Sequence, residues 1–414
     1  MERSQGGLEK SDTHWHVVEM KTHTTEPMNA SLQFCPNLTC SARGQVGQGN
    51  IVVHGRKRPR YKCKTCGRTF SAKAGTALEG LRKPTELVVI VMTLLAYGCP
   101  LQAIVHAFEV DERTVASWRD RAGKQCERVH QAIIEQGQLD LLHVQADEIR
   151  VRARGSIVWM GLAMMVSTRL WLAGVVSQTR DSALADGLLQ QVRRCCQKMC
   201  ALLICTDGWS AYPNSIRRAF REKVKRTAGR GRCALVVWPE LHIGTVIKRT
   251  VNKHLKEVMR QMTHGSLAHA LKLLGRSKGG EMLNTSFIER LNGTMRERLA
   301  ALTRKCRHAS CKLHALHTGM YLIGGTYNWC WPHHELSKPV EKGGFGMPCT
   351  PAMASGLTDH IWSVLELMTY KVAPPPLPIA KQRGRPRTKP LPDPTRPKRP
   401  RGRPRKVALC SSTA

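Results

Sequence analysis

The sequence predicts an α/β protein in which a mixed-sheet core follows a small cysteine-rich module and an all-α module. Three observations predict this class. Two cysteine pairs lie in residues 31–75, residues 82–126 have helical periodicity, and residues 139–335 combine β-branched apolar runs with amphipathic stretches. The chain has 414 residues, of which 42% are hydrophobic, so it can build two or three domains with real cores.

The charge balance predicts a nucleic-acid partner. The chain has 65 Lys and Arg against 30 Asp and Glu, a formal net charge of +35, and such an excess binds phosphate backbones by counterion release. No apolar run is long enough to span a bilayer, and residues 1–16 lack a signal-peptide core. We therefore expect a soluble cytoplasmic protein, associated with the nucleoid and not with a membrane.

The N-terminal cysteines predict one structural Zn²⁺ site. Residues 1–30 have no periodicity and are expected to be a flexible leader. The next segment, residues 31–75, contains the pairs Cys35 and Cys40, then Cys63 and Cys66. Paired thiolates on a hairpin frame suit tetrahedral zinc, which would substitute for a core that so short a segment cannot build. The sixteen cysteines lack the dense spacing of a secreted disulfide scaffold, so we expect reduced thiols otherwise.

A basic stretch separates the two cysteine pairs. It is either a solvated loop or a set of contacts to the DNA backbone, and the second interpretation is favoured because the module precedes a predicted DNA-binding segment. Its residues are Arg56, Lys57, Arg58 and Arg60.

Residues 82–126 predict a helix-turn-helix domain. Three short helical stretches follow one another, and Val110, Val115 and Trp118 would pack the second against the third. A plain three-helix bundle is the alternative. In the DNA-binding interpretation the third stretch is the recognition helix, and its residues on or near the groove-facing side are Glu112, Arg113, Ser117 and Arg119.

Residues 139–335 predict the catalytic core. Three consecutive strand candidates precede an amphipathic helix and a fourth strand, an order that the RNase H-like fold uses. The strand candidates are residues 139–149, 156–166, 170–177 and 201–207. A basic insert, residues 213–284, interrupts this core; it is either a solvated helical surface or, as its one-sign charge favours, a DNA track.

Three acidic residues predict a divalent-metal site. Asp147 and Asp207 end two of the strand candidates, and Glu289 lies on a stretch with helical periodicity. Carboxylates that converge in this way can hold two Mg²⁺ (or Mn²⁺) ions, which clamp the oxygens of a phosphoryl displacement. Glu148 is the rival to Asp147 as first ligand. Simpler roles are also open: a strand end at Asp147, a turn at Asp207 and a helix capping box at Glu289.

The helix that carries Glu289 is amphipathic. Its apolar stripe consists of Ile288, Leu291, Met295, Leu299 and Leu302. On the flank beside this stripe, with Glu289, lie Asn292 and Arg296, which we expect to contact DNA.

The C-terminal part changes composition sharply. Residues 336–371 predict a helical extension, and residues 372–414 form a Pro- and Arg-rich tail that cannot fold alone. The tail contains RGRPR twice, a pattern that resembles the AT-hook of the A·T minor groove; a generic polybasic tail is the alternative. The arginines of the two motifs are Arg383, Arg385, Arg387, Arg401, Arg403 and Arg405.

Two further sets of residues are candidates for metal binding but are expected to have other roles. Cys195, Cys196, Cys200 and Cys205 are expected to pack a helix against a strand rather than bind a second metal. The histidines that form no cluster in the sequence are His130, His143, His254, His264, His269, His314 and His317.

The sequence resembles prokaryotic insertion-sequence transposases of the DDE type with an N-terminal zinc ribbon. The motifs are GNIVVHGRKRPRYKCKTCGRTFS, QADE, CTDGWSAY, NTSFIERLNGTMRERLAALTRK, YNWCWPHHELS and TPAMASGLTDHIWSVLELM, over roughly residues 35–370. The resemblance implies an RNase H-like domain in which Asp147, Asp207 and Glu289 hold two Mg²⁺ ions. Asn328 and His333 match the family's Tyr-Asn and Pro-His segment. Trp331 and Glu335, however, stand where the family more often has Arg and Ser, so no catalytic role is expected there.

The leading hypothesis is a transposase that cleaves DNA at the element's ends and joins the freed 3′-hydroxyl to target DNA. We expect its partners to be double-stranded DNA, at the element's ends and in the target, and further copies of the chain in at least a dimer. The alternative is a non-catalytic DNA-binding regulator or architectural protein. A structure-selective nuclease on the same fold is a third hypothesis.

Overall fold

The computed structural model describes residues 29–55, 60–153, 156–225, 232–252, 254–299, 302, 312–337 and 346–374. The chain divides into two units, residues 1–374 and 375–414, and every described residue belongs to the first. Residues 1–28 of the predicted leader and residues 375–414 of the predicted tail, with both RGRPR motifs, lie outside the described residues.

The N-terminal module is a small antiparallel sheet with its own apolar cluster. Three strands pair in the order β1-β2-β3 after a short 3₁₀ turn, Ala30–Leu32. Its buried residues include Ile51, Tyr61 and Phe70 together with cysteines. This cluster is too small to stabilise a fold alone, which agrees with a need for metal. The strands are β1 (Ile51–Gly55), β2 (Arg60–Cys63) and β3 (Thr69–Ser71).

Three helices follow, as the periodicity predicts. The third begins at a side-chain cap, because Asp111 accepts hydrogen bonds from the backbone N–H groups of Arg113 and Thr114. It continues to Ile133, seven residues beyond the predicted segment 82–126, and packs along a helix of the core. The helices are α1 (Thr85–Ala96), α2 (Leu101–Phe108) and α3 (Glu112–Ile133).

The core is a six-stranded mixed sheet with the order β11-β10-β7-β4-β5-β6. β4, β5 and β6 are antiparallel neighbours, β4, β7 and β10 are parallel, and β11 adds antiparallel to β10 at the edge. These strands are β4 (His143–Ala153), β5 (Ser156–Met165), β6 (Trp171–Ser177), β7 (Leu202–Asp207), β10 (Leu241–Val251) and β11 (His254–His264). The four predicted core strands are therefore confirmed as neighbours in one mixed sheet.

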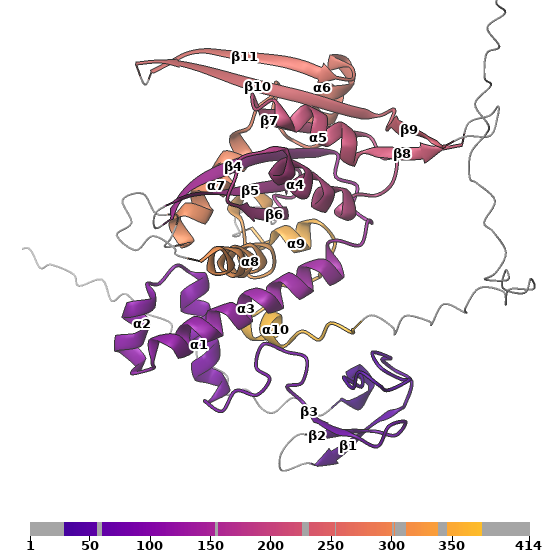
Figure 1. The fold of residues 1–414 in the computed structure, drawn as a ribbon, viewed down its shortest axis with the longest axis vertical. Coiled ribbons are helices and arrows are strands. Elements are labelled where there is room, and N and C mark those ends of the chain that lie inside the picture. Colours follow the sequence, from indigo (N-terminus) through magenta and orange to yellow (C-terminus); the bar gives the residue numbers. More distant parts are fainter. Residues whose placement is uncertain are drawn as a thin grey trace, which may run out of the picture. The chain divides into compact units, whose positions relative to one another are not determined.

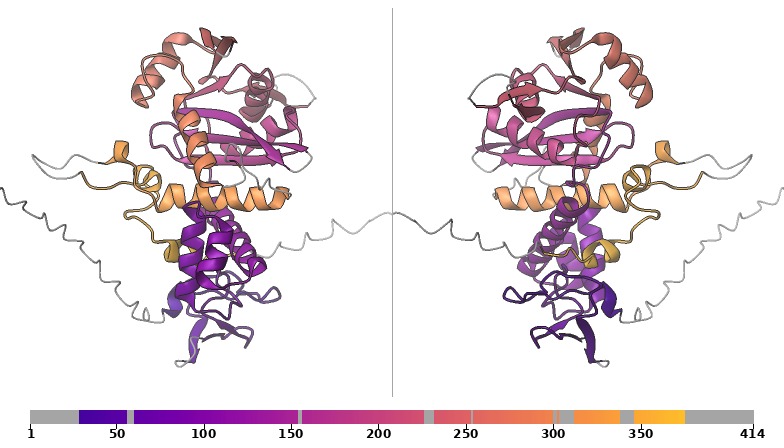
Figure 2. Two further views of the ribbon diagram at one scale, coloured as in Figure 1. Left: turned by 90° about the vertical axis from the view of Figure 1, so that its left-hand side faces the viewer. Right: turned by 90° about the vertical axis from the view of Figure 1, so that its right-hand side faces the viewer.

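Helices cover both faces of this sheet (Figures 1 and 2). α4 lies on one face, where Leu184 and Leu188 pack beside Gly161 of β5. α7 and α8 contact the sheet through β4, β5 and β6. The helices after α3 are α4 (Ser182–Cys195), α5 (Ala211–Ala219), α6 (Leu267–Arg276), α7 (Ser286–Arg298), α8 (Leu313–Trp329), α9 (Pro351–Ala354) and α10 (Val364–Thr369).

Two segments differ from their predicted secondary structure. The basic insert, residues 213–284, is mainly β: it contains β8 (Arg221–Val224), β9 (Ala234–Val237), β10 and β11, with the end of α5 and all of α6. Residues 245–251 are rich in β-branched valine, isoleucine and threonine, which favour a strand, but the positive charges around them led to the prediction of a helical or DNA-binding surface. In the described part of the predicted helical extension, residues 336–337 and 346–371, the structure has only the short helices α9 and α10 after the 3₁₀ turn His334–Leu336.

The buried residues of α1–α3 belong to the same apolar cluster as those of the sheet and α8. α3 and α8 cross closely at Gly123, where a Cβ atom would lie 2.1 Å from the backbone oxygen of Thr318. Only glycine permits this approach, since both atoms in conflict are tied to helical backbone. The helix-turn-helix segment therefore depends on the core for its packing.

We expect Gly123→Ala to lower the free energy of unfolding by about 2 kcal/mol or more, because α3 and α8 must separate. The matched control is Gly293→Ala on α7, where an added Cβ meets nothing within 4 Å. It should be neutral or stabilising by up to about 1 kcal/mol. Urea denaturation of both variants checks this; equal effects would show that the crossing is not tight.

Candidate metal centres

Four cysteine sulfurs converge in the N-terminal module. The Sγ atoms of Cys35 and Cys66 are 3.6 Å apart, those of Cys40 and Cys63 are 3.8 Å apart, and all four lie within 4.8 Å of one another. A tetrahedral zinc with Zn–S bonds of about 2.3 Å would place its sulfurs about 3.8 Å apart. The predicted four residues are therefore together at zinc-binding spacing.

The backbone also suits thiolate at this centre. The N–H groups of Asn37, Ala42 and Arg68 hydrogen-bond the sulfurs of Cys35, Cys40 and Cys66, respectively. The Arg68 N–H lowers the pKa of Cys66 to about 6, whereas burial raises the pKa of Cys35 to about 12. A bound cation would offset this burial, so the donor set fits zinc.

A second centre is acidic and lies where β4 and β7 adjoin. Ala146 pairs with Thr206 in the parallel register, so the next residues, Asp147 and Asp207, are neighbours. Oxygens of Asp147, Glu148 and Asp207 lie within 4.8 Å of one another. An all-oxygen, acidic donor set is what Mg²⁺ or Mn²⁺ prefers.

Asp147 lies on the sheet face that α7 covers. Its Oδ1 accepts the backbone N–H of Glu148 at 2.8 Å, and its Oδ2 accepts Nδ2 of Asn292 at 2.7 Å. Burial, followed by the charges of Glu148 and Asp207, raises the pKa of Asp147 to about 7. Oδ1 of Asn292 is buried and has no hydrogen-bond donor among the described residues. It adds an unused oxygen beside the acidic centre.

Glu148 points to the opposite face of β4, as the two-residue period of a strand requires. Its Oε2 accepts the hydroxyl of the buried Tyr212 at 2.8 Å, and its Oε1 accepts Nε of Arg180 at 2.6 Å. The side chain is only 3% exposed. Burial raises the pKa of Glu148 despite these partners. The sequence left open whether Asp147 or Glu148 is the first ligand, and in the structure both belong to the acidic centre.

Arg180 supplies the positive charge at this centre. Its Nη2 is 3.6 Å from Oδ2 of Asp207, besides its bond to Glu148. The guanidinium lies over the rings of Trp209 and Trp159, 4.6 and 5.2 Å from their centroids. Cation–π contacts of this kind hold the charge in place. We did not predict this residue, because an arginine between a strand and a helix has no distinctive pattern.

Glu289 is not part of the converging set. Its carboxylate accepts hydrogen bonds from Nζ of Lys248 and, at 2.7 Å, from Oγ1 of Thr285. Burial acts to raise its pKa, but these two donors outweigh burial and leave the pKa lowered. Glu289 is near enough that its charge contributes to the raised pKa of Asp147. The predicted third ligand is therefore beside the centre, paired with a lysine.

The predicted DNA-binding residues have different surroundings. Arg113 and Ser117 are exposed on α3, while Arg119 donates to Asp120 through two nitrogens at 3.0 and 3.1 Å. Arg60 is exposed on β2 and donates to Thr69. Asn292 is 1% exposed and bound to Asp147, so it differs from the expectation of a DNA contact, whereas Arg296 is half-buried on α7. The others lie outside the described residues: Arg56, Lys57, Arg58, Arg383, Arg385, Arg387, Arg401, Arg403 and Arg405.

Glu240, His242 and His269 also bring three potential ligands within 4.8 Å, a grouping that the sequence did not suggest. His242 is buried, and its Nδ1 accepts the backbone N–H of Ser266 at 3.1 Å. In the neutral ring the proton then sits on Nε2, the nitrogen that faces Glu240 at 3.9 Å. This tautomer cannot ligate through Nε2, so the grouping does not fit a metal site.

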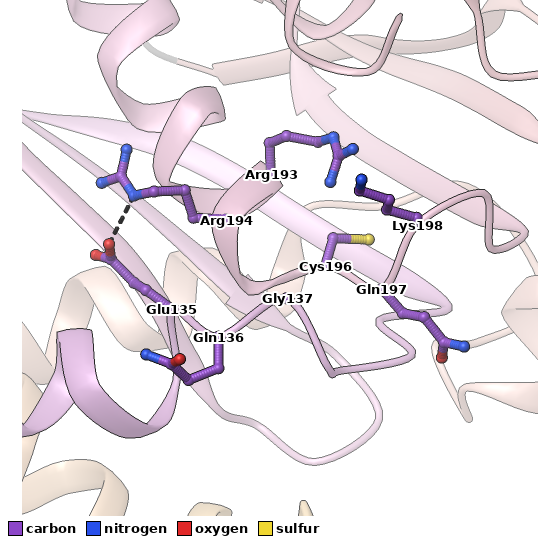
Figure 3. Close-up of a pocket in the computed structure, with 8 residues that line it drawn as sticks. All are labelled: Glu135, Gln136, Gly137, Arg193, Arg194, Cys196, Gln197 and Lys198. Atoms are coloured by element: carbon purple, nitrogen blue, oxygen red, sulfur yellow. Dashed lines mark hydrogen bonds and ion pairs between the residues drawn. The ribbon is translucent and has the colours of Figure 1, made fainter. Parts of the chain in front are cut away.

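A surface hollow at the end of α4 shares no residue with either metal centre (Figure 3). Its arginines are engaged: Arg194 pairs with Glu135 at 2.7 Å and Arg193 with Glu222 at 2.6 Å. Cys196 lines it and lies 3.4 Å from the sulfur of Cys200. The four cysteines Cys195, Cys196, Cys200 and Cys205 are not among the converging ligand groups of the described chain.

Asn328 and His333 have structural surroundings. The Asn328 side chain bonds both the N–H and the C=O of Trp171, each at 2.9 Å, and so ties α8 to β6. His333 packs against Tyr327, and burial lowers its pKa to about 4. Neither residue belongs to the acidic group of Asp147, Glu148 and Asp207.

Comparison with protein-family models finds none that matches the chain, and comparison with curated proteins likewise finds no match. Within the described ranges, no helix is both long and apolar enough to cross a membrane.

We expect one Zn²⁺ per chain in protein purified without chelator. Cys63→Ser should lose most of it and expose the N-terminal module to protease, while the sheet and its helices stay folded because their apolar cluster is separate. Metal analysis with limited proteolysis tests this. Cys349→Ser, which removes a buried thiol elsewhere, is the control. Zinc-free wild-type protein would contradict the assignment.

In metal-free protein, the pKa of Asp147 predicts a pH-dependent stability. The folded state binds this proton up to about pH 7, but the ordinary pKa is 3.8. The free energy of unfolding should therefore fall as pH rises from about 4 to about 7. Asp147→Asn should flatten this slope, and Mg²⁺ should stabilise the wild type more at pH 8 than at pH 5. Identical pH slopes for wild type and variant in chelator would contradict the raised pKa.

Proposed function

We propose that the protein is a DNA transposase of the DDE type, which cleaves DNA at the ends of an insertion sequence and joins them to target DNA. The observation that carries the proposal is the convergence of Asp147 and Asp207 on two neighbouring parallel strands, with Asp147 inside β4 rather than at its predicted end and Asp207 at the end of β7. These aspartates lie on the first and last elements of the series β4, β5, β6, α4, β7. This series of three antiparallel strands, a helix and a parallel strand is the order of an RNase H-like catalytic domain. The motif resemblance and the net charge of +35 support the same function.

The residues at the acidic centre suit phosphodiester chemistry with divalent metal. When bound there, Mg²⁺ or Mn²⁺ would lower the pKa of the attacking water or 3′-hydroxyl and stabilise the leaving oxygen. Asp147 and Asp207 would hold it, together with Glu148 or Glu289. Asn292 orients Asp147, and Arg180 with Tyr212 orients Glu148. Without the contact from Asn292, or without those from Arg180 and Tyr212, the carboxylate would be less well oriented and the free energy needed to assemble the metal site would rise.

The N-terminal parts support DNA recognition. The first two turns of α3 present Arg113 and Ser117 to solvent, after a turn in which Glu109 adopts a left-handed φ of 49°. An exposed helix start with polar side chains is the part of a helix-turn-helix that reads base edges. We infer that α3 and the cysteine module bind the ends of the element, and that the active form on DNA is at least a dimer.

One observation favours a second function, a non-catalytic DNA-binding protein. Arg180 occupies the acidic centre and Glu289 pairs with Lys248, so the three predicted ligands are not assembled. A regulator that had lost catalysis would tolerate this arrangement. Cleavage of DNA in Mg²⁺ separates the two functions, and joined products separate a transposase from a nuclease.

We expect Asp147→Asn, Asp207→Asn and Glu289→Gln each to lower Mg²⁺-dependent cleavage by more than about a hundredfold, because the amides keep shape but lose the charge that holds metal. The assay uses duplexes that carry the flanks of the reading frame, with strand-transfer products mapped in parallel. The affinity of each variant for DNA in chelator should change less than about twofold, since these acidic side chains contact few of the phosphates that the protein binds.

The control is Glu222→Gln, which removes a partner of Arg193 outside the centre. Near-normal cleavage by a variant would remove that residue from the site. If Glu148→Gln abolishes cleavage and Glu289→Gln does not, Glu148 is the third ligand. No cleavage by the wild type, with tight binding, would favour the non-catalytic function.

A further inference from the structure

A two-stranded ribbon extends beyond the sheet beside the acidic centre. β10 pairs with β7 only over Leu241–Val246; from Ile247 onward, β10 and β11 pair only with each other. We call Ile247–Val251 with residues 254–259 the ribbon; it is visible in Figure 1 as the free end of β10 and β11. Five residues of strand span about 17 Å.

Both faces of the ribbon are open to solvent. Residues 248–252 and 254–257 are all exposed, and only Ile247 and Val258 of the ribbon are half-buried. The ribbon is anchored in the sheet through the first half of β10, and beyond that point its faces are free to contact a partner. The question is which partner chemistry the ribbon suits.

The ribbon's charge suits a polyanion. Among its described residues, Lys248, Arg249 and Lys256 are positive and only Glu257 is negative. Arg249 and Glu257 are paired at 3.6 Å, but their side chains are 72% and 51% exposed, so water screens the pair and Arg249 remains available to a phosphate.

The root of the ribbon touches the proposed active site. Val246 pairs with Asp207, the side chain of Ile247 lies against Gly208, and Lys248 bonds Glu289. A polymer that lies along the ribbon is therefore led to the acidic carboxylates.

A second copy of the chain is the competing occupant, because Val251, Leu255 and Met259 are exposed apolar residues of the ribbon. The register argues against it. Along one face, the pairs Ile247 with Met259, Arg249 with Glu257 and Val251 with His254 alternate apolar and charged or polar. Leu255 pairs with Thr250 on the other face. Neither face has the contiguous apolar stripe of a stable protein interface.

We propose that the ribbon is a DNA-binding clamp, which holds duplex DNA through its phosphates next to the acidic centre. A two-stranded ribbon has the width to enter the major groove, and its lysines and arginine flank the strands where phosphates approach. This proposal rests on the proposed function, since it names how that same site receives its substrate.

The test variant is Arg249→Gln with Lys256→Gln, and the matched control is Lys272→Gln with Arg276→Gln, two exposed cations of α6. Binding of the full-length protein to random-sequence duplex is measured in chelator across a salt series. The ribbon variant should bind about tenfold more weakly and lose about 1.8 from the slope of log affinity against log salt, for two phosphates. The control should change both values little.

Amine labelling of the wild type gives an independent measurement that needs no variant. DNA should protect Lys256 from the reagent more than it protects Lys272. Equal protection, or a ribbon variant with unchanged affinity and slope, overturns the clamp. If Leu255→Ser with Met259→Ser instead lowers the mass of the protein in solution while DNA binding stays normal, the ribbon is a protein interface and the clamp is wrong.

The same experiments distinguish failure of the clamp from failure of the proposed transposase function. A wild-type protein that binds DNA through the ribbon but yields no cleaved product in Mg²⁺ retains the clamp and loses the transposase. Cleavage by the wild type together with an unaffected ribbon variant retains the transposase and loses the clamp.

Discussion

Repulsion between carboxylates where the end of β7 meets the middle of β4 is the constraint on which the rest of the site depends. Two unit charges 4.8 Å apart repel by about 3 to 4 kcal/mol at an effective dielectric of about 20. Arg180, Tyr212 and Asn292 offset part of this repulsion by donating to the carboxylates. They come from the connection after β6, from α5 and from α7, so helices on both faces of the sheet must pack before the centre exists.

The alternation of β4 divides two consecutive acids between two environments. Asp147 faces α7 with few donors, and its raised pKa of about 7 means that a proton or a metal ion stabilises it. Glu148 faces α5 and is fixed by Arg180 and Tyr212. Asp147 can therefore take up either a proton or a metal ion. Glu148 instead keeps Arg180 as its positively charged partner, and the rings of Trp159 and Trp209 hold that arginine in place.

The negatively charged carboxylates of the acidic centre lie next to the positively charged ribbon. The carboxylates alone would repel a nucleic-acid backbone, whereas the ribbon, which begins one residue after the partner of Asp207 in β10, is basic. Lys248 joins the two regions through Glu289. A substrate with phosphates would be attracted to the ribbon and reach the acids only with a divalent cation between them, which couples binding to metal occupancy.

The sequence alone determined the four cysteines as a zinc set, the strands of the mixed sheet and the choice of Asp147 and Asp207 as a pair, because cysteine spacing, β-branched runs and acids beside such runs are local patterns that can be read without the fold. Only the tertiary structure decided that Glu148 joins them, that Arg180 fills the centre, that Glu289 pairs with Lys248 and that the basic insert forms a ribbon. The contacts of Glu148 with Arg180 and of Glu289 with Lys248 join residues 32 and 41 positions apart, and the ribbon depends on strand pairing that its run of charges does not predict. Such contacts arise from how the helices pack on the sheet, which local periodicity does not encode.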